Sequence, residues 1–195
     1  MSDAVRVGMP LVEFLELSAQ QPFELINGER RPIVPTVYRH SKAIQFLLFR
    51  LRDYTQVYGG NVFSETTFIL PSADKSRWVE GSRIPDVMLF LDNRIAEYEA
   101  SDPEYLDIPL ALIPDLVIEV VSPTDKLIEV AEKIDAYLAD GVRLIWQVDT
   151  YTRKVIVFSP DAEQPHYLKT GDVLDGGDIL PDFRLPLTEL FAAVG

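Results

Sequence analysis

The feature that most constrains the fold is the segment 115–121, DLVIEVV, which is apolar on both faces except at its two acids. Side chains alternate along a strand. One face therefore carries Leu116, Ile118 and Val120, and the other carries Asp115, Val117, Glu119 and Val121. A strand with two apolar faces lies inside a sheet that other layers cover on both sides. The segment predicts the central strand of a layered domain.

Periodicity and turn residues predict the elements around this strand. Helices are expected at 10–20, 39–58 and 124–140, a hairpin at 23–33, and strands within 61–91, 142–149 and 153–159, before a tail of short strands and a final helical turn. Gly59 and Gly141 end the second and third helices. This order predicts an α/β (α+β) fold with a central mixed β-sheet flanked by helices.

The composition excludes several kinds of site. The chain has 195 residues, no cysteine and two histidines, so disulfides, thiol nucleophiles and cysteine-bound zinc are excluded, and a histidine-rich metal site is not expected. No run approaches the ~18 apolar residues of a membrane span. We expect a soluble, cytoplasmic protein with no membrane partner.

Charge is distributed unevenly along the chain. The net charge is −13, and residues 86–140 hold 14 acidic and 3 basic side chains, a net of −11. Residues 28–55 hold six basic and two acidic side chains, a net of +4. This segment is either a solvated basic helix on an acidic protein or a phosphate-facing rim beside an acidic, metal-attracting centre. Composition alone leaves both interpretations open.

Two carboxylates stand where strand faces are otherwise apolar. Glu119 has a valine two positions away on each side, and Asp86 is the only charge on its face of the expected strand RIPDVMLFL. An ionised carboxylate buried without a partner costs several kcal/mol or takes a raised pKa. Each acid therefore needs a metal ion, a lysine or an arginine beside it.

Distance selects which acids form a pair. Asp115 and Glu119 are about 13 Å apart along one strand, too far to chelate one ion, whereas Asp86 and Glu119 could be neighbours on strands ~4.8 Å apart. We therefore expect Asp86 with Glu119 in a hard-cation site, and Asp115 as a residue that starts the strand.

The helix 124–140 could supply a balancing charge. Its expected apolar stripe is Leu127, Val130, Ala131, Ile134 and Leu138, with Lys126, Lys133 and Tyr137 on one flank. Core packing is the preferred expectation for Tyr137 and for the tryptophans Trp78 and Trp146.

Five blocks in this order resemble a known family: RIPDV (83–87), PDLVIEVVSPT (114–124), EKIDAYLADGV (132–142), IWQVD (145–149) and the tail 171–191. They are similar to the PD-(D/E)xK nuclease superfamily and, within it, to the Uma-two-type restriction endonucleases, a domain of unknown function. FELINGE (23–29) and His40 fit the same family, so the resemblance covers nearly the whole chain. It implies one restriction-endonuclease-like domain, 1–195, with N-terminal helices and hairpin 1–60, a nuclease-like core 61–160, and C-terminal strands with a short helix 161–195.

The resemblance also implies residue roles. Asp86 matches the motif aspartate and Glu119 the (D/E), as ligands of Mg²⁺ or Mn²⁺. The motif lysine would fall at position 121, which is Val121 here, and Lys133 on the following helix matches instead. The catalytic set implied is Asp86, Glu119 and Lys133, acting by metal-assisted hydrolysis of DNA.

Glu24 and His40 match family positions as accessory residues, and Arg39, Lys42, Arg50 and Arg83 are the expected DNA-binding cations. The alternatives are a hairpin acid for Glu24, a helix-start hydrogen bond for His40, and a salt bridge to Glu129 or to neighbours on the Tyr137 side for Lys133. A homodimer is expected, because cutting both strands needs two sites.

Two other functions remain open at this stage. The first is a catalytically inactive nuclease-fold module, also a homodimer, that serves in binding or regulation. The second is a glycoside hydrolase that uses paired carboxylates; it ranks low because tryptophans are scarce and the lysine would have no role. The presence of all three members of the implied catalytic set favours the nuclease.

Overall fold

A six-stranded mixed sheet forms the centre of the computed structural model, which describes residues 7–72, 77–101 and 106–195. Its strand order is β11-β10-β9-β8-β7-β4, and β8 pairs parallel with β9 and antiparallel with β7. In chain order these strands are β4 (Asn61–Ser64), β7 (Val87–Phe90), β8 (Leu116–Val121), β9 (Leu144–Asp149), β10 (Lys154–Phe158) and β11 (His166–Lys169). The predicted central strand and the mixed sheet are confirmed.

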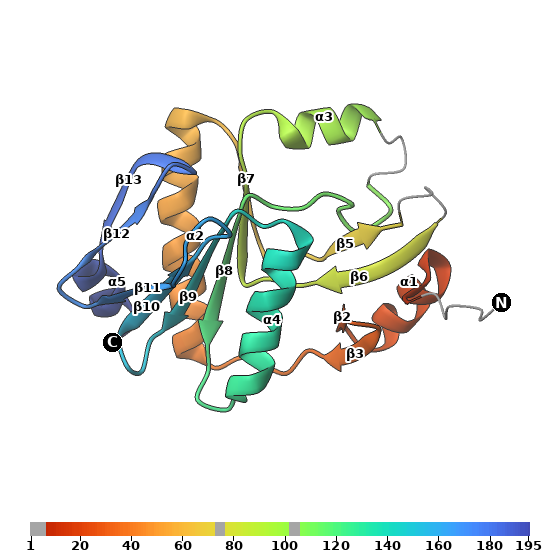
Figure 1. Cartoon of the computed structure of the whole chain (residues 1–195), viewed down its shortest axis with the longest axis horizontal. Coiled ribbons are helices and arrows are strands. Elements are labelled where there is room, and N and C mark those ends of the chain that lie inside the picture. Colours follow the sequence, from red (N-terminus) through yellow and green to blue (C-terminus); the bar gives the residue numbers. More distant parts are fainter. Residues whose placement is uncertain (1–6, 73–76, 102–105) are drawn as a thin grey trace.

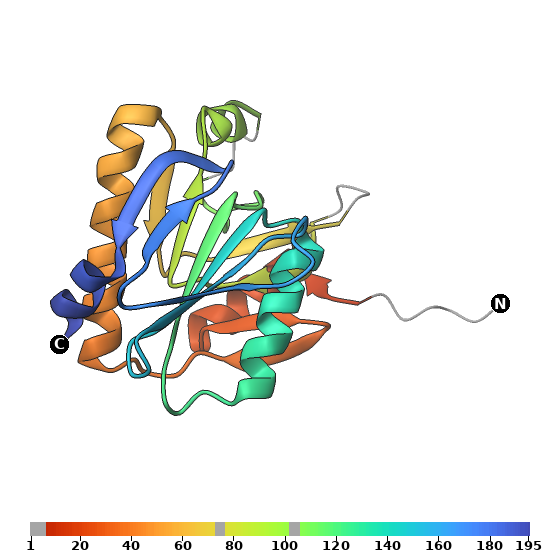
Figure 2. The same ribbon diagram turned by 60° about the vertical axis from the view of Figure 1, so that its left-hand side comes forward.

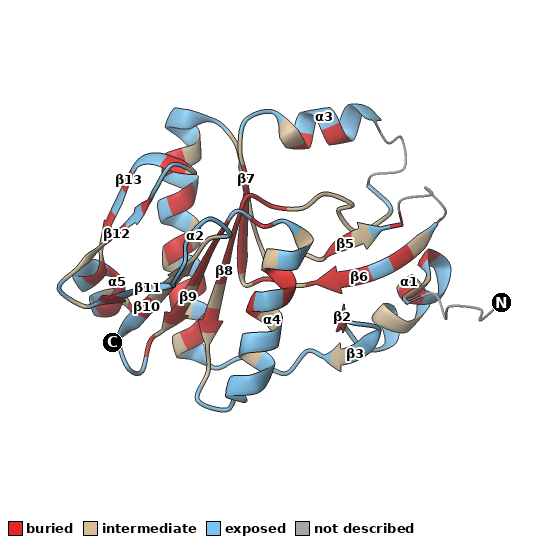
Figure 3. Ribbon diagram, viewed as in Figure 1, coloured by how far each residue is buried: buried red, intermediate tan, exposed pale blue. Residues whose placement is uncertain are grey.

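Helices cover both faces of this sheet (Figures 1 and 2). The helices are α1 (Leu11–Gln20), α2 (Tyr38–Tyr58), α3 (Arg94–Ser101), α4 (Leu127–Asp140) and α5 (Leu187–Val194). The long helix α2 lies on one face with α5, and α4 lies on the opposite face. The central strands are accordingly the most continuously buried part of the chain (Figure 3).

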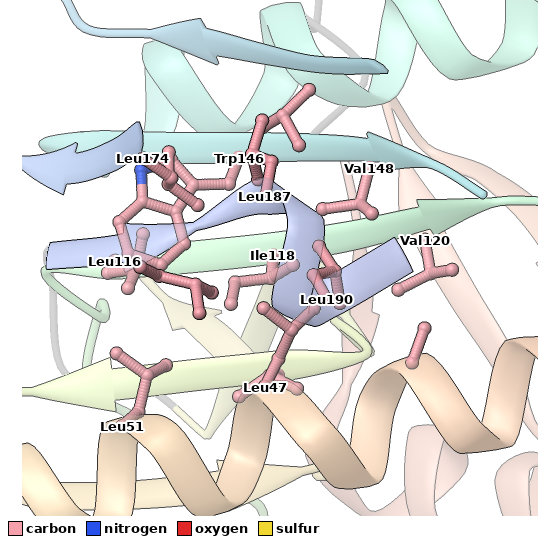
Figure 4. Close-up of a cluster of buried hydrophobic side chains, with 14 of the residues drawn as sticks. Leu47, Leu51, Leu116, Ile118, Val120, Trp146, Val148, Leu174, Leu187 and Leu190 are labelled. Atoms are coloured by element: carbon pink, nitrogen blue, oxygen red, sulfur yellow. The ribbon is translucent and has the colours of Figure 1, made fainter. Parts of the chain in front are cut away.

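The two faces of β8 belong to two hydrophobic clusters, as its alternation predicts. Leu116, Ile118 and Val120 pack with Leu47 of α2 and Leu190 of α5 (Figure 4). Val117 faces the other way, into the cluster that contains Ile134 and Tyr137 of α4. Trp146 of β9 is fully buried, so the core role expected for it is confirmed.

A second sheet lies beside the first and carries the N-terminal hairpin. It contains β1 (Met9–Pro10), β2 (Phe23–Ile26), β3 (Glu29–Pro32), β5 (Phe68–Pro71) and β6 (Trp78–Arg83), in the order β1-β6-β2-β3 with β5 beside β6. Asn27 and Gly28 form the β2–β3 turn with φ of 52° and 82°, a left-handed pair that suits a two-residue hairpin. A third pair, β12 (Val173–Gly176) and β13 (Leu180–Pro186), precedes α5.

Three predicted elements differ from the structure. Residues 61–70 divide into β4 and β5 in different sheets, with Glu65 between them at φ 48°. The expected strand RIPDVMLFL begins at Val87, so Asp86 lies just before it. The predicted stripe of α4 is wrong in its first turns: Leu127 is 85% exposed, because this end lies beside a cavity beyond the end of β8 rather than over the sheet.

Among the described residues, no helix combines the length and apolar character needed to cross a lipid bilayer.

The packing of α2 on β8 predicts a clear difference between two substitutions on one helix. Leu47 is fully buried in the core, so Leu47→Ala should lower the free energy of unfolding by about 2–5 kcal/mol. Val57 on the same helix is 75% exposed, and Val57→Ala should change it by less than ~0.5 kcal/mol. Urea unfolding of the two variants measures both effects, and equal losses would contradict this account of the core.

Candidate active site

Strand pairing brings the two selected carboxylates together. Val87 of β7 is the register partner of Ile118 of β8, and the antiparallel register extended by one residue sets Asp86 opposite Glu119. The backbone N–H of Val120 donates to Oδ2 of Asp86 at 2.6 Å. The structure therefore brings Asp86 and Glu119 together as expected, with Asp86 held by β8 itself.

Two side chains of α4 contact Glu119 from the helix layer. Lys133 Nζ lies 3.0 Å from the Glu119 carboxylate, and the Tyr137 hydroxyl donates to its Oε1 at 2.6 Å. The two residues are one turn apart, so one helix face presents both donors to one carboxylate. The Glu119 side chain is only 13% exposed, and this pair of donors supplies the partners that its burial requires.

Glu24 of β2 joins the same cluster. Its Oε1 accepts the backbone N–H of Ile84 at 2.8 Å and lies 3.0 Å from Lys133 Nζ. Lys133 thus lies between carboxylates from two sheets, and its side chain is 18% exposed. Glu24 is thus both a paired acid of the hairpin and a member of this cluster.

His40 reaches the site from the first turn of α2. Its Nε2 lies 3.2 Å from Oδ2 of Asp86, and its Nδ1 is buried with no hydrogen-bond partner among the described residues. Burial lowers the pKa of His40, but the hydrogen bond and charge of Asp86, with the more distant Glu119 and Asp125, outweigh it and leave the pKa raised. The imidazole therefore contacts the site directly, and the helix-start alternative does not describe it.

Five of these side chains line one cavity of about 500 Å³. Its lining includes Glu24, His40, Asp86, Glu119 and Lys133. The loop before α2 and the segment between β8 and α4 form its rim. The carboxyl end of β8 and the first turns of α2 and α4 all lie at the lower end of the molecule in Figure 1.

Burial and neighbouring charge shift the protonation equilibria in this cavity. The pKa of Glu119 is raised to about 8. Burial is the largest cause, Lys133 lowers the pKa, and the charges of Asp86 and Glu24 raise it further. Burial lowers the pKa of Lys133, but Glu119, Glu24 and Asp86 outweigh it, so the net shift is upward. Lys133 is consequently a permanent cation in a site with excess negative charge.

The donor set is suited to a hard divalent cation. Among the described residues no three His, Asp or Glu side chains form a ready metal cluster, but Mg²⁺ usually takes one or two carboxylates and keeps several waters. Within the described part of the chain both side-chain contacts of Asp86 use Oδ2, so its Oδ1 is left for a ligand. Asp86 therefore offers one carboxylate oxygen to such an ion, whereas Glu119 would join it by exchanging a contact with Lys133 or Tyr137.

The expected DNA-binding cations separate into two groups. Arg39, Lys42 and Arg50 lie on the accessible side of α2, with Arg50 paired to Glu189 of α5. Arg83 is 3% exposed and pairs with Asp140 at 2.9 Å, so it is not available to a phosphate. The prediction for Arg83 is corrected: its guanidinium joins β6 to the end of α4.

One site residue, Tyr137, was not predicted from the sequence, and helical spacing alone did not distinguish Lys133 from Lys126. Tyr137 is fully buried, as expected of a core residue, yet its hydroxyl is a direct partner of Glu119. Its position four residues after Lys133 was the signal for this role. Lys126 precedes α4 and pairs with exposed Glu129 at 2.8 Å, so it lies outside the cluster.

Asp115 has the structural role that its place in the chain predicts. It is 3% exposed at the start of β8 and pairs with Arg94 at 2.6 Å and Arg143 at 3.2 Å. It also accepts the backbone N–H of Leu91. These contacts fix the end of β8 opposite to the cavity.

The buried carboxylate predicts how stability depends on pH. With the pKa of Glu119 raised from 4.5 to about 8, the folded protein holds a proton there that the unfolded chain has lost. The free energy of unfolding should therefore fall as the pH rises from 4.5 to 8, by at most ~1.4 kcal/mol per pH unit. Glu119→Gln cannot ionise and should fall less steeply over this window in urea unfolding with EDTA present. Parallel curves for the two proteins would contradict the raised pKa.

Known proteins provide a similar fold and a family for this chain. The crystal structure of a "putative nuclease belonging to DUF820" from Anabaena variabilis ATCC 29413 is similar, with a TM-score of 0.76, 21% identity, and coverage of 96% of this chain and 99% of that one. At this identity the likeness shows the fold. No curated protein matches the chain. The family model Uma2, described as "Putative restriction endonuclease", matches residues 11–188, so the chain belongs to the Uma2 family.

Proposed function

We propose that this protein is a divalent-metal-dependent endonuclease that hydrolyses phosphodiester bonds of DNA. The observation that carries the proposal is the convergence of Asp86, Glu119 and Lys133 in one cavity, from the residue before β7, from β8 and from α4. Membership of a family described as restriction endonucleases, and the fold shared with a protein described as a nuclease, support the same class.

Asp86 and Glu119 would hold Mg²⁺, or Mn²⁺ in its place. A divalent cation there supplies Lewis-acid chemistry: it lowers the pKa of water and polarises a phosphate oxygen. The excess of carboxylates over cations in the cavity supports this assignment. Burial, together with the charges of Asp86 and Glu24, raises the pKa of Glu119, and a bound ion would favour its ionised form.

Lys133 provides the charge that the protein itself contributes. Its ammonium stays protonated across the physiological range, because its pKa is raised. Its three donors can orient the attacking water or bind the oxygens on which negative charge develops. Tyr137 and Glu24 fix the carboxylate and the ammonium of this pair, so neither has to reorganise when the substrate enters.

His40 holds Asp86 from the opposite side. Its Nε2 donates to Oδ2, which keeps Asp86 in one orientation and directs Oδ1 toward a ligand. The cations Arg39 and Lys42 on the same helix would bind the phosphate backbone of the substrate. The expected homodimer would place two such sites in one assembly.

A non-catalytic module is the second candidate, and one observation favours it. Lys133 already contacts both Glu119 and Glu24, so a salt-bridged cluster of this kind can be stable with no metal. Such a protein would keep the fold and lose hydrolysis. The two candidates differ in their dependence on metal and on Lys133.

Plasmid nicking separates the two candidates. Wild type should nick supercoiled DNA in Mg²⁺ or Mn²⁺ and not in EDTA. Lys133→Met should lower the rate by about 10²–10³-fold, the cost of removing one preorganised donor.

Lys126→Met is the matched control, because this lysine lies just before the same helix and pairs only with exposed Glu129 within the described residues. It should nick at the wild-type rate. Nicking that survives EDTA or Lys133→Met would come from a contaminant or another site. A folded wild type with no nicking in either metal would favour the non-catalytic module.

A further inference from the structure

Two exposed tyrosines stand beside the cavity, each with a cation near its ring. Tyr38, the first residue of α2, is 80% exposed, and Lys42 Nζ lies 6.0 Å from its ring centroid. Tyr151 is 50% exposed, and Arg39 Cζ lies 5.0 Å from its ring centroid. We call these four residues the tyrosine ledge.

The chain and the strand register position the ledge near residues that line the cavity. Tyr38 and Arg39 immediately precede His40, which lines the cavity. Tyr151 follows β9, whose last residue Asp149 is the register partner of the cavity residue Val121. The ledge residues do not line the cavity themselves, but on both sides they are close neighbours of residues that do, in the chain or in the strand register.

The turn that carries Tyr151 is fixed by hydrogen bonds. Oδ1 of Asp149 accepts the backbone N–H groups of Tyr151 and Thr152, each at 2.9 Å. These hydrogen bonds set the backbone from which the ring projects, while half of the side chain stays accessible to solvent. Because the backbone of the turn is already ordered, less conformational entropy is lost when a flat ligand stacks on the ring.

We propose that the tyrosine ledge binds unpaired nucleotides, so that the substrate of the proposed nuclease is a single-stranded polynucleotide or the single-stranded part of a longer one. This inference rests on the proposed function. Exposed aromatic rings accompanied by cations bind single strands by stacking on bases and attracting phosphates. In a duplex the base faces are already stacked on one another and cannot reach a protein ring.

The depth of the acidic groups points to the same substrate. The side chains of Asp86 and Glu119 are 15% and 13% exposed, so the scissile phosphate has to enter the cavity. A duplex is stiff, with a persistence length of about 150 base pairs, whereas a single strand bends freely. A single strand can therefore bring one phosphate to the recessed carboxylates with far less deformation.

The charged side chains around the cavity also favour one direction of approach for the polynucleotide. Asp125 and Glu129 lie on the cavity wall near the start of α4, where they repel phosphate. Arg39 and Lys42 lie on the α2 side, with exposed Arg153 and Lys154 after Tyr151. We expect the polynucleotide to enter over the tyrosine ledge, with its bases on the tyrosines and its phosphates along these cations.

Fluorescence anisotropy with a labelled oligothymidylate tests the ledge on the full chain, in buffer with Ca²⁺. Tyr38→Ala and Tyr151→Ala should each weaken binding by about five- to a hundredfold, while Tyr38→Phe and Tyr151→Phe should bind as wild type does. Tyr58→Ala, at the opposite end of the same helix, is the control and should leave binding unchanged. A blunt duplex of equal length should bind more weakly than the single strand.

Alanine variants that bind as tightly as wild type, a preference for the duplex, or no binding of either probe would each overturn the inference. Hydrolysis of bis(4-nitrophenyl) phosphate in Mg²⁺ or Mn²⁺, by wild type and Lys133→Met, tests the proposed function separately, because this small ester has no base to stack. Hydrolysis with tyrosine-independent binding overturns the ledge alone. Tyrosine-dependent strand binding without hydrolysis supports the ledge and overturns the proposed nuclease.

Discussion

The contact between the Glu119 carboxyl group and the Lys133 ammonium joins the central sheet to α4 at a point where neither group is well solvated. Each side chain is less than one-fifth exposed, and each has a second partner, Tyr137 for the acid and Glu24 for the lysine. Removing Lys133 would leave the buried carboxyl groups of Glu119 and Glu24 without their shared cation, and the loss of a buried charge partner is strongly destabilising. The position of α4 on the sheet, and of the hairpin against α4, therefore depends on this contact.

The same contact explains why the site forms where it does. β8 is parallel to β9 and antiparallel to β7, so its carboxyl end meets the chain just before β7 and brings Asp86 opposite Glu119. α2 contributes His40 from one face of the sheet, and α4 contributes Lys133 from the other. A hydrophobic core would exclude such a charged cluster. It is tolerated at this end of the sheet because each residue has at least one partner and the cavity is open to solvent.

Local pattern was sufficient for much of this arrangement. The alternation in DLVIEVV identified the central strand and the face that carries Glu119, and helical spacing set Lys133 beside Tyr137. The family resemblance, confirmed by the match over residues 11–188, selected Lys133 over Lys126. The spacing between neighbouring strands showed only that Asp86 and Glu119, 33 residues apart in the chain, could lie side by side. The β7–β8 register in the structure shows that they do.

Other contacts depend on tertiary structure that no local pattern contains. Arg83 looked like a surface cation, but β6 runs beneath the end of α4, where Asp140 neutralises it. Leu127 fitted the apolar stripe, but the sheet ends before the first turn of α4. Tyr151 and Arg39 are 112 residues apart and meet only because the turn after β9 lies beside the start of α2.

The proposed function requires Asp86 and Glu119 to be the ligands of a divalent ion, and titration calorimetry with Mg²⁺ and Mn²⁺ tests this most directly. Wild type should bind the ion. Asp86→Asn and Glu119→Gln should lose that binding while circular dichroism shows that they are folded. Glu97 is an exposed acid on α3, and the control variant Glu97→Gln should bind the ion as wild type does. Binding that survives in both site variants, or a wild type indifferent to both metals, would contradict it.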